Sequence, residues 1–413
     1  MLHTPARPRR ASRRAIVSVL AVGLVLLTAC DPPFPSADPF YKPPSPLPAG
    51  QPGDVITSRS SVFTLDPIGH APVANVRSSQ VLYRSVDALG QPMAVTGTVL
   101  VPTTTWAGPG ARPLVSYAVG TRGVGDDCAP SYTLSQGADY EELFVKALLD
   151  QGWAVAVSDY QGLGTPGLHT YMVGPAQGHA VLDMARAAQR LPGTGLSANT
   201  PVGFMGYSQG GGAAGWAAEL AGSYAPELKV KGSVLGGVPG DLTATAELLD
   251  GSPFVAFALM SAMGLDAAYP ELDLETYLNP RGQELIRTSQ QMCLVDVAGF
   301  STLIDVAFSH LDDYVTTNPL HTPAWQARLA ETKLGKAKPN APVFQYHGAL
   351  DEIVPFPQAA DLRRTWCTKG ANVTWTVLPA EHVLGLVQGP PLGVPWLAAR
   401  FAGVPTFGNC LLP

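Results

Sequence analysis

Ser208 is the residue in this sequence around which reactive chemistry is most readily built. It lies in the pentapeptide Gly206-Tyr207-Ser208-Gln209-Gly210, after the apolar run Pro201–Met205 and before the helix-like segment Ala213–Ala221. A serine between a buried strand and a helix sits on a sharp turn that exposes its hydroxyl as a nucleophile. Glycines on both sides let backbone and helix approach closely. A glycine-rich loop with a chance serine is the competing interpretation, and the flanking strand and helix favour the nucleophile.

A serine nucleophile needs a base that takes its proton and a carboxylate that orients the base. Asp351 follows the apolar run Val343–Tyr346, and His382 follows the run Val373–Leu378. Both residues therefore stand just after expected strands, in the order Ser, Asp, His along the chain. We expect Ser208, Asp351 and His382 to form a catalytic triad.

Other carboxylates and histidines compete for these roles. Glu352 and Glu381 adjoin the expected aspartate and histidine, but neither matches a strand end as well. His347 lies at a strand terminus and is expected to be structural. His169 and His179 lie before or at the start of a helix and are expected to be loop or cap histidines.

Acyl transfer also needs two hydrogen-bond donors for the negative oxygen that forms during the reaction. The N–H of Gln209, which directly follows the serine, is the expected first donor. The second must come from another strand-end loop, and Ser158-Asp159-Tyr160-Gln161-Gly162 is the best placed. We expect the backbone N–H of Asp159 to donate. Its carboxyl group should be turned away or hydrogen-bonded, because a carboxylate would oppose the oxyanion.

The elements that must position these residues alternate along the chain from about residue 54. The runs Gln80–Val86 and Met93–Val101 predict two neighbouring antiparallel strands. Pro113–Val119, Trp153–Ser158 and Val230–Gly237 are short and apolar, which is typical of strands buried on both faces. Alternating strands and helices predict an α/β fold with a mainly parallel sheet and helices on both faces. Functional residues collect at the carboxyl ends of such strands.

The alternation stops between residues 239 and 340. This segment has no convincing inner strand and contains the apolar run Pro253–Met260. We interpret residues 239–340 as an inserted helical cap or lid over the catalytic face, and residues 55–238 and 341–413 as the core. Most of the apolar run is expected to be buried in the cap, and part of it could line an acyl pocket.

Residues 1–29 have the pattern of an export signal. Arginines without an acidic residue precede the apolar segment Ala15–Leu27, which is too short to span a bilayer comfortably. Leu27-Thr28-Ala29-Cys30 resembles a lipobox, in which the cysteine is lipidated, and an ordinary signal peptide is the alternative. Ser12–Val17 also resembles a twin-arginine signal, so the export route stays open. Residues 30–54 are rich in proline and predict an extended tether.

Cysteine count and charge limit the remaining possibilities. Cys30 aside, the cysteines are Cys128, Cys293, Cys367 and Cys410. An even set in an exported protein suggests two disulfides, with three possible pairings, and free buried thiols are the alternative. The formal net charge of −6 argues against nucleic acid as a partner. No spacing of His, Cys, Asp or Glu suggests a metal, and we expect no cofactor.

These residues together resemble the secretory lipase family, from about residue 80 to the C-terminus and through the cap. The matching motifs are Gly206-Tyr207-Ser208-x-Gly210, Ser158-Asp159-Tyr160-Gln161-Gly162, Ser223-Tyr224-Ala225-Pro226-Glu227-Leu228, Pro253-Phe254-x-x-Phe257-Ala258-Leu259, Asp351-Glu352-Ile353-Val354-Pro355, Cys367-x-Lys369-Gly370-Ala371-Asn372 and Ala380-Glu381-His382. The resemblance implies an α/β-hydrolase fold with a helical lid, the triad Ser208-Asp351-His382, and an oxyanion hole from Asp159 and Gln209. It also implies the disulfides Cys128–Cys293 and Cys367–Cys410. Gln209 departs from a yeast member of the family, which has glycine after the serine.

The sequence therefore predicts an exported, monomeric carboxylic-ester hydrolase, a lipase acting on triacylglycerol or related acyl esters. It would be a cell-envelope lipoprotein held at a membrane through Cys30, or a secreted protein. An exported serine peptidase of the same fold is one alternative, although no propeller domain and no acidic pair for a substrate amine are evident. A lipid-binding lipoprotein that has lost turnover is the other.

Overall fold

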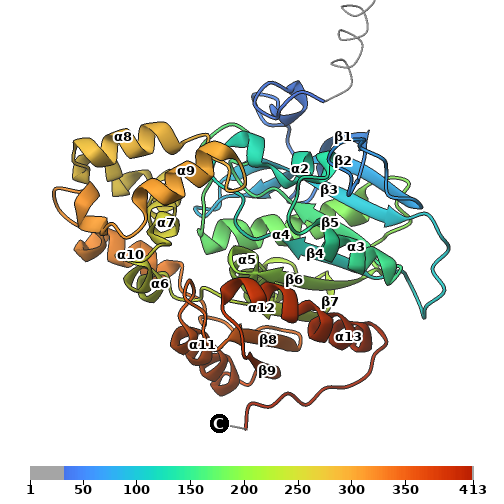
Figure 1. The fold of residues 1–413 in the computed structure, drawn as a ribbon. Helices are drawn as coiled ribbons and strands as arrows, with labels where there is room; N and C mark the ends of the chain where they lie inside the picture. The colour runs from blue at the N-terminus through green and yellow to red at the C-terminus, as the bar shows by residue number, and fades with distance from the viewer. Residues whose placement is uncertain (1–31, 412–413) are drawn as a thin grey trace, which may run out of the picture.

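The computed structural model describes residues 32–411, so the expected export signal and Cys30 lie outside the described residues. A nine-stranded sheet in the order β1-β2-β3-β5-β4-β6-β7-β8-β9 forms its centre (Figure 1). The strands are β1 (Val55–Ser61), β2 (Val76–Val86), β3 (Pro92–Pro102), β4 (Leu114–Ala118), β5 (Ala154–Ser158), β6 (Pro201–Tyr207), β7 (Lys229–Gly236), β8 (Val343–Gly348) and β9 (Val373–Leu378). Strands β1, β2 and β3 pair antiparallel, β3 pairs antiparallel with β5, and all later pairings are parallel.

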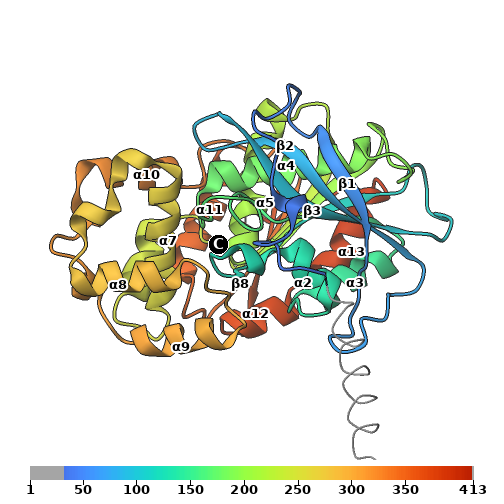
Figure 2. The ribbon, with the colours of Figure 1, turned by 90° about the horizontal axis from the view of Figure 1, so that it is seen from above.

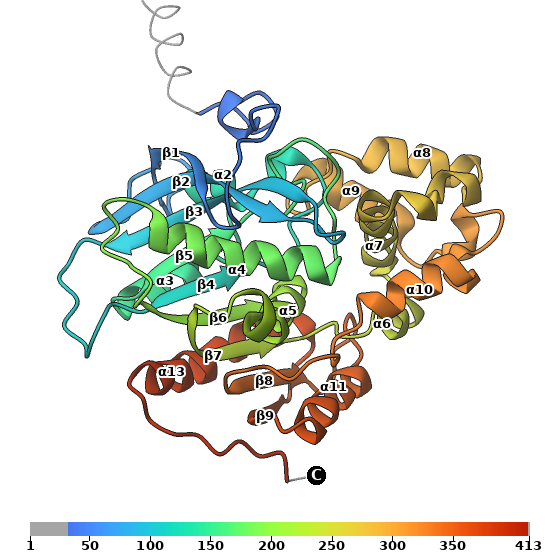
Figure 3. The same ribbon diagram turned by 180° about the vertical axis from the view of Figure 1, so that it is seen from behind.

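Helices cover both faces of this sheet, and further helices lie at one end of it. The α-helices of the described residues are α2 (Pro130–Gln136), α3 (Glu142–Asp150), α4 (Gly174–Arg190), α5 (Gln209–Tyr224), α6 (Leu242–Leu249), α7 (Val255–Ala268), α8 (Pro280–Ser289), α9 (Val297–Val306), α10 (Pro323–Glu331), α11 (Phe356–Thr368), α12 (His382–Gln388) and α13 (Pro390–Phe401). Figures 1 and 3 view the molecule from opposite sides, with α13 in front of the sheet in Figure 1 and α4 and α5 in front of it in Figure 3. The predicted α/β fold with helices on both faces is confirmed.

Short apolar runs became the central strands because both of their faces are covered. Every residue of β4 and β5 is buried. In contrast, β1 alternates between half-buried and exposed residues, because it is an edge strand paired only with β2. The alternation in β1 is weak, and the sequence pattern did not predict this strand.

The segment between β7 and β8, residues 239–340, contains α6 to α10 and contributes no strand to the sheet. Its helices lie at one end of the molecule, to the left in Figure 2. They pack around an apolar cluster in which Met260, Met263 and Trp325 are buried, and which also contains Tyr171 and Val173 from outside this segment. We call residues 239–340 the cap.

Two disulfides are present, Cys128–Cys293 and Cys367–Cys410. This pairing, which the family resemblance implied, is confirmed. The first disulfide joins a core loop to the cap, and the second joins α11 to the C-terminal segment.

Residues 32–54 differ from the extended tether that their prolines predicted. Pro39–Tyr41 forms a short 3-10 turn capped by Asp38. Tyr41 is fully buried, and its hydroxyl lies 2.9 Å from the hydroxyl of Ser131. Asp38 also forms an ion pair of 2.6 Å with Arg59 of β1. The burial of an aromatic ring outweighs the preference of its proline neighbours for an extended, solvated chain.

None of the helices within residues 32–411 is both long enough and apolar enough to span a membrane.

Candidate active site

The turn between β6 and α5 holds Ser208, because the strand ends one residue before it and the helix begins one residue after it. Ser208 has φ 57° and ψ −124°, a positive-φ conformation that costs a residue with a Cβ about 1–3 kcal/mol. The positions two residues to either side must be glycine, because there is no space for a Cβ atom. A Cβ on Gly206 would lie 2.3 Å from the carbonyl oxygen of Gly210, and a Cβ on Gly210 would lie 2.0 Å from that of Ala118. The strained turn predicted for a nucleophile elbow is therefore present.

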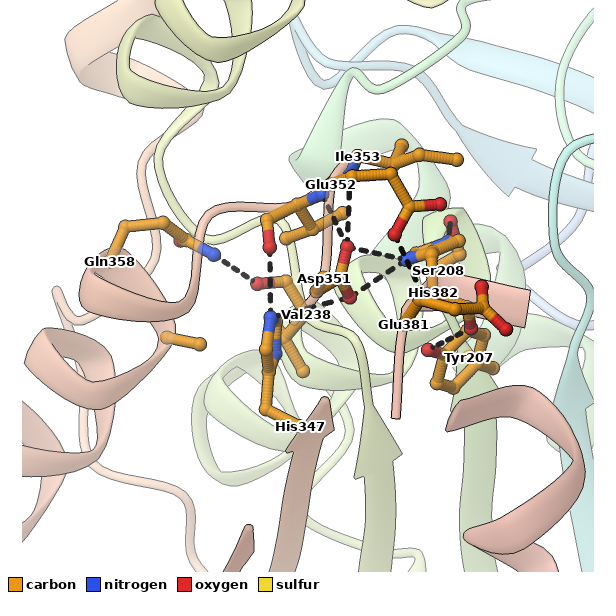
Figure 4. A network of polar contacts seen from close by, with 12 residues as sticks. Tyr207, Ser208, Val238, His347, Asp351, Glu352, Ile353, Gln358, Glu381 and His382 are labelled. Carbon is orange, nitrogen blue, oxygen red and sulfur yellow. Dashed lines mark hydrogen bonds and ion pairs between the residues drawn. The ribbon is translucent and has the colours of Figure 1, made fainter. Parts of the chain in front are cut away.

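His382 lies within hydrogen-bond distance of both Ser208 and Asp351 (Figure 4). The Nε2 atom of His382 is 3.0 Å from Ser208 Oγ, and its Nδ1 atom is 2.9 and 2.8 Å from the two carboxylate oxygens of Asp351. Asp351 follows β8, and His382 is the first residue of α12 after β9. Because β6, β7, β8 and β9 run parallel, their carboxyl ends meet at one edge of the sheet and bring the three residues together.

The charge of Asp351 decides where the proton of His382 resides. Burial raises the pKa of the Asp351 carboxyl group, but the hydrogen bond and charge of His382 outweigh burial, and the pKa lies below its ordinary value. The backbone N–H groups of Ile353 and Val354 donate to the same carboxylate at 3.1 and 2.7 Å. An ionised Asp351 holds a proton on Nδ1 of His382, so the lone pair of Nε2 faces the Ser208 hydroxyl.

The two competing glutamates have other partners. Glu352 accepts a hydrogen bond from the backbone N–H of His382 at 3.1 Å. Glu381 caps α12 by accepting from the backbone N–H groups of Val383 and Leu384 at 2.6 and 2.8 Å. The geometry therefore favours Asp351 as the partner of the imidazole.

His347 is buried below the triad and has the structural role expected of it. Its Nε2 lies 2.9 Å from the carbonyl oxygen of Val354 and 3.4 Å from Asp351 Oδ2. Burial lowers the pKa of His347, which favours a neutral ring that donates to the carbonyl. This contact fixes the loop that carries Asp351.

Gln209 has the position expected of an oxyanion donor. It is the first residue of α5, and the first N–H groups of a helix have no acceptor within the helix. Gln209 and Ser208 line the same cavity. The positive end of the helix dipole also lies at this position, which favours a developing negative charge.

The prediction that Asp159 supplies the second oxyanion donor is wrong. Its N–H donates to the carbonyl oxygen of Thr96 at 2.9 Å and continues the antiparallel pairing of β3 with β5. Its buried carboxyl group accepts from the N–H and the hydroxyl of Ser131 at 2.7 and 2.5 Å, so it is hydrogen-bonded as expected. The strand register directs this N–H to a neighbouring strand and away from the cavity.

Thr121 is a candidate that the sequence analysis missed. It lies in the loop after β4 and lines the cavity that holds Ser208 and Gln209. Within residues 32–411, its N–H has no hydrogen-bond acceptor. The available signal was the glycine-rich loop after Pro113–Val119. The side-by-side pairing of β4 with β6 brings this loop to the nucleophile.

His169 also escaped the sequence analysis as a site residue. Its Nε2 lies 3.0 Å from the side-chain nitrogen of Gln209, and its Nδ1 lies 2.7 Å from the carbonyl oxygen of Gln161. Burial lowers the pKa of His169 to about 4, so the ring is neutral at neutral pH. Nδ1 then donates to Gln161, and Nε2 accepts from Gln209. A histidine 40 residues earlier in the chain therefore holds the Gln209 side chain.

A cavity of about 330 Å³ has Ser208 and His382 in its wall. Cap residues, among them Phe257 and Leu294, also line this cavity. A second cavity of about 80 Å³ lies within the cap and is lined mainly by apolar side chains. The two cavities share Leu242, Ala246, Ala258 and Ser261, so they adjoin each other.

Comparisons with known proteins agree with this fold. The family model described as secretory lipase matches residues 129–409. A probable inactive lipase from Mycobacterium tuberculosis is 34% identical over 91% of this chain and 84% of that protein. A secreted triacylglycerol lipase from Malassezia furfur is 32% identical over 76% of this chain and 84% of that protein. The crystal structure of Candida antarctica lipase A in its closed state has a TM-score of 0.83 at 30% identity, over 93% of this chain and 90% of that one. Because the family model spans more than half of the sequence, this chain belongs to the secretory lipase family.

Proposed function

We propose that this protein is an exported serine ester hydrolase that cleaves triacylglycerol or related acyl esters. The observation that carries the proposal is the 3.0 Å contact between His382 Nε2 and Ser208 Oγ, with Asp351 on the other side of the imidazole. The cavity beside this contact is largely apolar, as an acyl chain requires. Membership of the secretory lipase family supports the reaction class and export.

In the acylation step, Ser208 Oγ attacks the ester carbonyl carbon while its proton moves to Nε2 of His382. Asp351 stabilises the imidazolium that forms. The carbonyl oxygen becomes negative and accepts hydrogen bonds from the backbone N–H groups of Gln209 and Thr121. The bond to the alcohol oxygen then breaks, and His382 gives its proton to the leaving alkoxide. An acyl group remains on Ser208.

In the second step, His382 takes a proton from water, and the resulting hydroxide attacks the acyl carbonyl. The same two N–H groups stabilise the second tetrahedral intermediate. Collapse of this intermediate breaks the bond to Ser208 Oγ, returns the proton to the serine and releases a carboxylic acid. No cofactor enters either step.

Substrate choice is proposed to depend on the two cavities. The first receives the scissile ester, and the apolar cavity within the cap receives the distal part of the acyl chain. Burial of each methylene contributes about 0.8 kcal/mol, so longer chains gain affinity until the cavity is filled. In this proposal the cap acts as a lid over the site.

Hydrolysis of p-nitrophenyl butyrate and of emulsified trioctanoin by wild type and Ser208→Ala tests the function. We expect wild type to hydrolyse both and Ser208→Ala to lose activity by about 10³-fold or more. Equal activity of the two proteins would end the proposal.

Export and anchoring are tested separately. Residues 1–29 and the lipobox that ends at Cys30 support a lipoprotein signal. Wild type should incorporate a labelled fatty acid and remain in the membrane fraction, whereas Cys30→Ser should not be labelled. If wild type is not labelled, the lipid anchor is ruled out, and the protein would be secreted without one.

A binding protein without turnover is the second candidate, because one relative is described as a probable inactive lipase. A fluorophosphonate probe distinguishes the two, since it phosphonylates an activated serine. Labelling of wild type and not of Ser208→Ala supports the enzyme. An unlabelled wild type that retains fatty acids supports the binder.

A further inference from the structure

Side chains hold several backbone polar groups of the loop after β4 and leave others open. The N–H of Gly120 donates to Glu141 Oε2 at 3.0 Å, and the carbonyl oxygen of Gly120 accepts from Arg122 Nη1 at 3.2 Å. The carbonyl oxygen of Thr121 accepts from the hydroxyl of Tyr140 at 2.9 Å. Across the described residues, the N–H groups of Thr121, Arg122 and Gly123 have no acceptor, and Thr121 is the one of the three that lines the cavity with Ser208. Buried backbone groups are nearly always paired, so these open donors are a specific feature of the loop.

A buried ion network supplies these contacts. Arg122 donates from Nε and Nη2 to Asp139 at 3.0 and 2.7 Å, and from Nη2 to Glu141 at 2.9 Å. These three side chains are at most 3% exposed. The guanidinium also stacks over the ring of Tyr140, 4.0 Å from its centroid. Because the guanidinium is planar and bidentate, the network fixes position and orientation together.

The loop has no room to relax. A Cβ on Gly120 would lie 2.7 Å from the Tyr140 hydroxyl and 3.3 Å from Glu141. From the other side, Leu294 of the cap donates its N–H to the carbonyl oxygen of Arg122 at 2.8 Å. The loop is therefore held between the ion network and the cap.

We propose that Arg122, Asp139, Glu141 and Tyr140 are positioning residues that aim the Thr121 N–H at the oxyanion formed on the substrate of Ser208. This inference rests on the proposed ester hydrolysis. It assigns a catalytic purpose to a buried ion network that the triad mechanism does not use. The network acts through the backbone of Gly120 and Thr121, and a misplacement of such a donor by about 1 Å can cost about 10²-fold in rate.

The charge balance agrees with this purpose. Glu141 lines the cavity, where an unpaired carboxylate would repel the oxyanion. Burial raises the pKa of Glu141, while Arg122 and the Gly120 N–H oppose that shift. The Oε2 atom is occupied by both donors, so its charge is directed at the loop backbone and the guanidinium.

The test removes one hydroxyl. Tyr140→Phe leaves the ring under Arg122 and deletes only the contact with the Thr121 carbonyl oxygen. We expect kcat for p-nitrophenyl butyrate to fall about tenfold with KM changed less than about twofold, which is the pattern of a lost transition-state interaction. The inhibition constant of an alkyl trifluoromethyl ketone, which forms an oxyanion on the serine, should rise by the same factor as kcat/KM falls.

A second pair of variants guards against misfolding. Glu141→Ala removes the acceptor of the Gly120 N–H, and Glu141→Gln restores a neutral acceptor. We expect kcat to fall more in the alanine variant than in the glutamine variant. The melting temperature of Tyr140→Phe should equal that of wild type, which would show that this variant folds normally.

Tyr224→Phe is the matched control. Its ring also lies beneath an arginine, Arg186, and its hydroxyl donates to buried Asp183 at 2.8 Å, but it does not line the cavity. Its kcat should equal that of wild type. If Tyr140→Phe keeps wild-type kcat and ketone affinity while Ser208→Ala is inactive, the positioning role is refuted and the proposed function stands. If wild type hydrolyses no ester, both fall.

Discussion

Replacing His169 should reduce the amount by which the free energy of unfolding falls when the pH is lowered. The side chain is 1% exposed and contacts Gln161 and Gln209. Burial lowers its pKa from 6.5 to about 4 in the folded state. As the pH falls below 6.5, the unfolded chain takes up a proton that the folded protein does not bind until about pH 4. The unfolded state is therefore favoured increasingly through this window.

The size of the effect follows from the pKa difference. One pKa unit corresponds to about 1.36 kcal/mol, so the fall from 6.5 to about 4 amounts to about 3 kcal/mol. This stability is present in full above pH 6.5 and is lost by about pH 4. Between about pH 7 and about pH 4.5, where urea unfolding can be measured, the contribution is about 2 kcal/mol.

The assay compares the free energy of unfolding at these two pH values in wild type and His169→Gln, with the disulfides intact. Glutamine does not titrate, so the variant should lose about 2 kcal/mol less than wild type between them. His310→Gln is the control, because it removes an exposed histidine whose pKa is raised by the hydrogen bond to Asp250. In that variant, the free energy of unfolding should fall between the two pH values by at least as much as in wild type. If His169→Gln loses as much stability as wild type, a buried neutral imidazole is not the cause and the reasoning is refuted.

Three further substitutions test other parts of the structure. Asp351→Asn should lower kcat for p-nitrophenyl esters by about 10⁴-fold, because an amide no longer fixes the proton on Nδ1 of His382; a wild-type kcat would contradict the triad. Gly210→Ala places a Cβ 2.0 Å from the Ala118 carbonyl oxygen, so we expect a distorted elbow and a loss in kcat of about 10²-fold or more, measured on any soluble protein recovered. Tyr41→Ala should lower the free energy of unfolding by about 3–5 kcal/mol, and Tyr41→Phe by only about 1 kcal/mol. An unchanged melting temperature in Tyr41→Ala would mean that residues 32–54 are a loose tether after all.

The meeting of Ser208, Asp351 and His382 at one edge of the sheet could be predicted because each residue has a local signal. Ser208 has glycines that the turn requires, and Asp351 and His382 each follow an apolar run that became a strand. Parallel pairing then guarantees that these strand ends meet. The same logic predicted the sheet and the helical content of the cap.

The second oxyanion donor that we propose, Thr121, could not be predicted, because strand-end position does not fix the direction of an N–H. Asp159 stands at a strand end, as expected, but its N–H is used in the pairing with β3. Thr121 lies three residues beyond the end of the neighbouring strand β4, and its N–H has no acceptor within residues 32–411. Asp159 directly follows its strand and remains within reach of the pairing, whereas Thr121 lies in the loop beyond it.

His169 and Tyr41 were missed for a different reason. His169 contacts Gln209 from another element, and neither residue has a local motif that names the other. Tyr41 lies among prolines, whose preference for extended backbone concealed the apolar pair Phe40 and Tyr41. Long-range packing decided both positions, and composition alone could not reveal it.

The order of the strands along the chain also determines the order in which the sheet can form during synthesis. In a chain that emerges from its N-terminus, β1 to β7 and the turn at Ser208 are complete before the cap, and β8 and β9 follow only after the cap. Until then, one edge of β7 has no partner and is open to pairing with other chains, so the interval is a period of aggregation risk. Asp351 and His382 arrive with the last strands. During synthesis, the turn at Ser208 is therefore present while the whole cap is being made, before Asp351 or His382 can lie beside it.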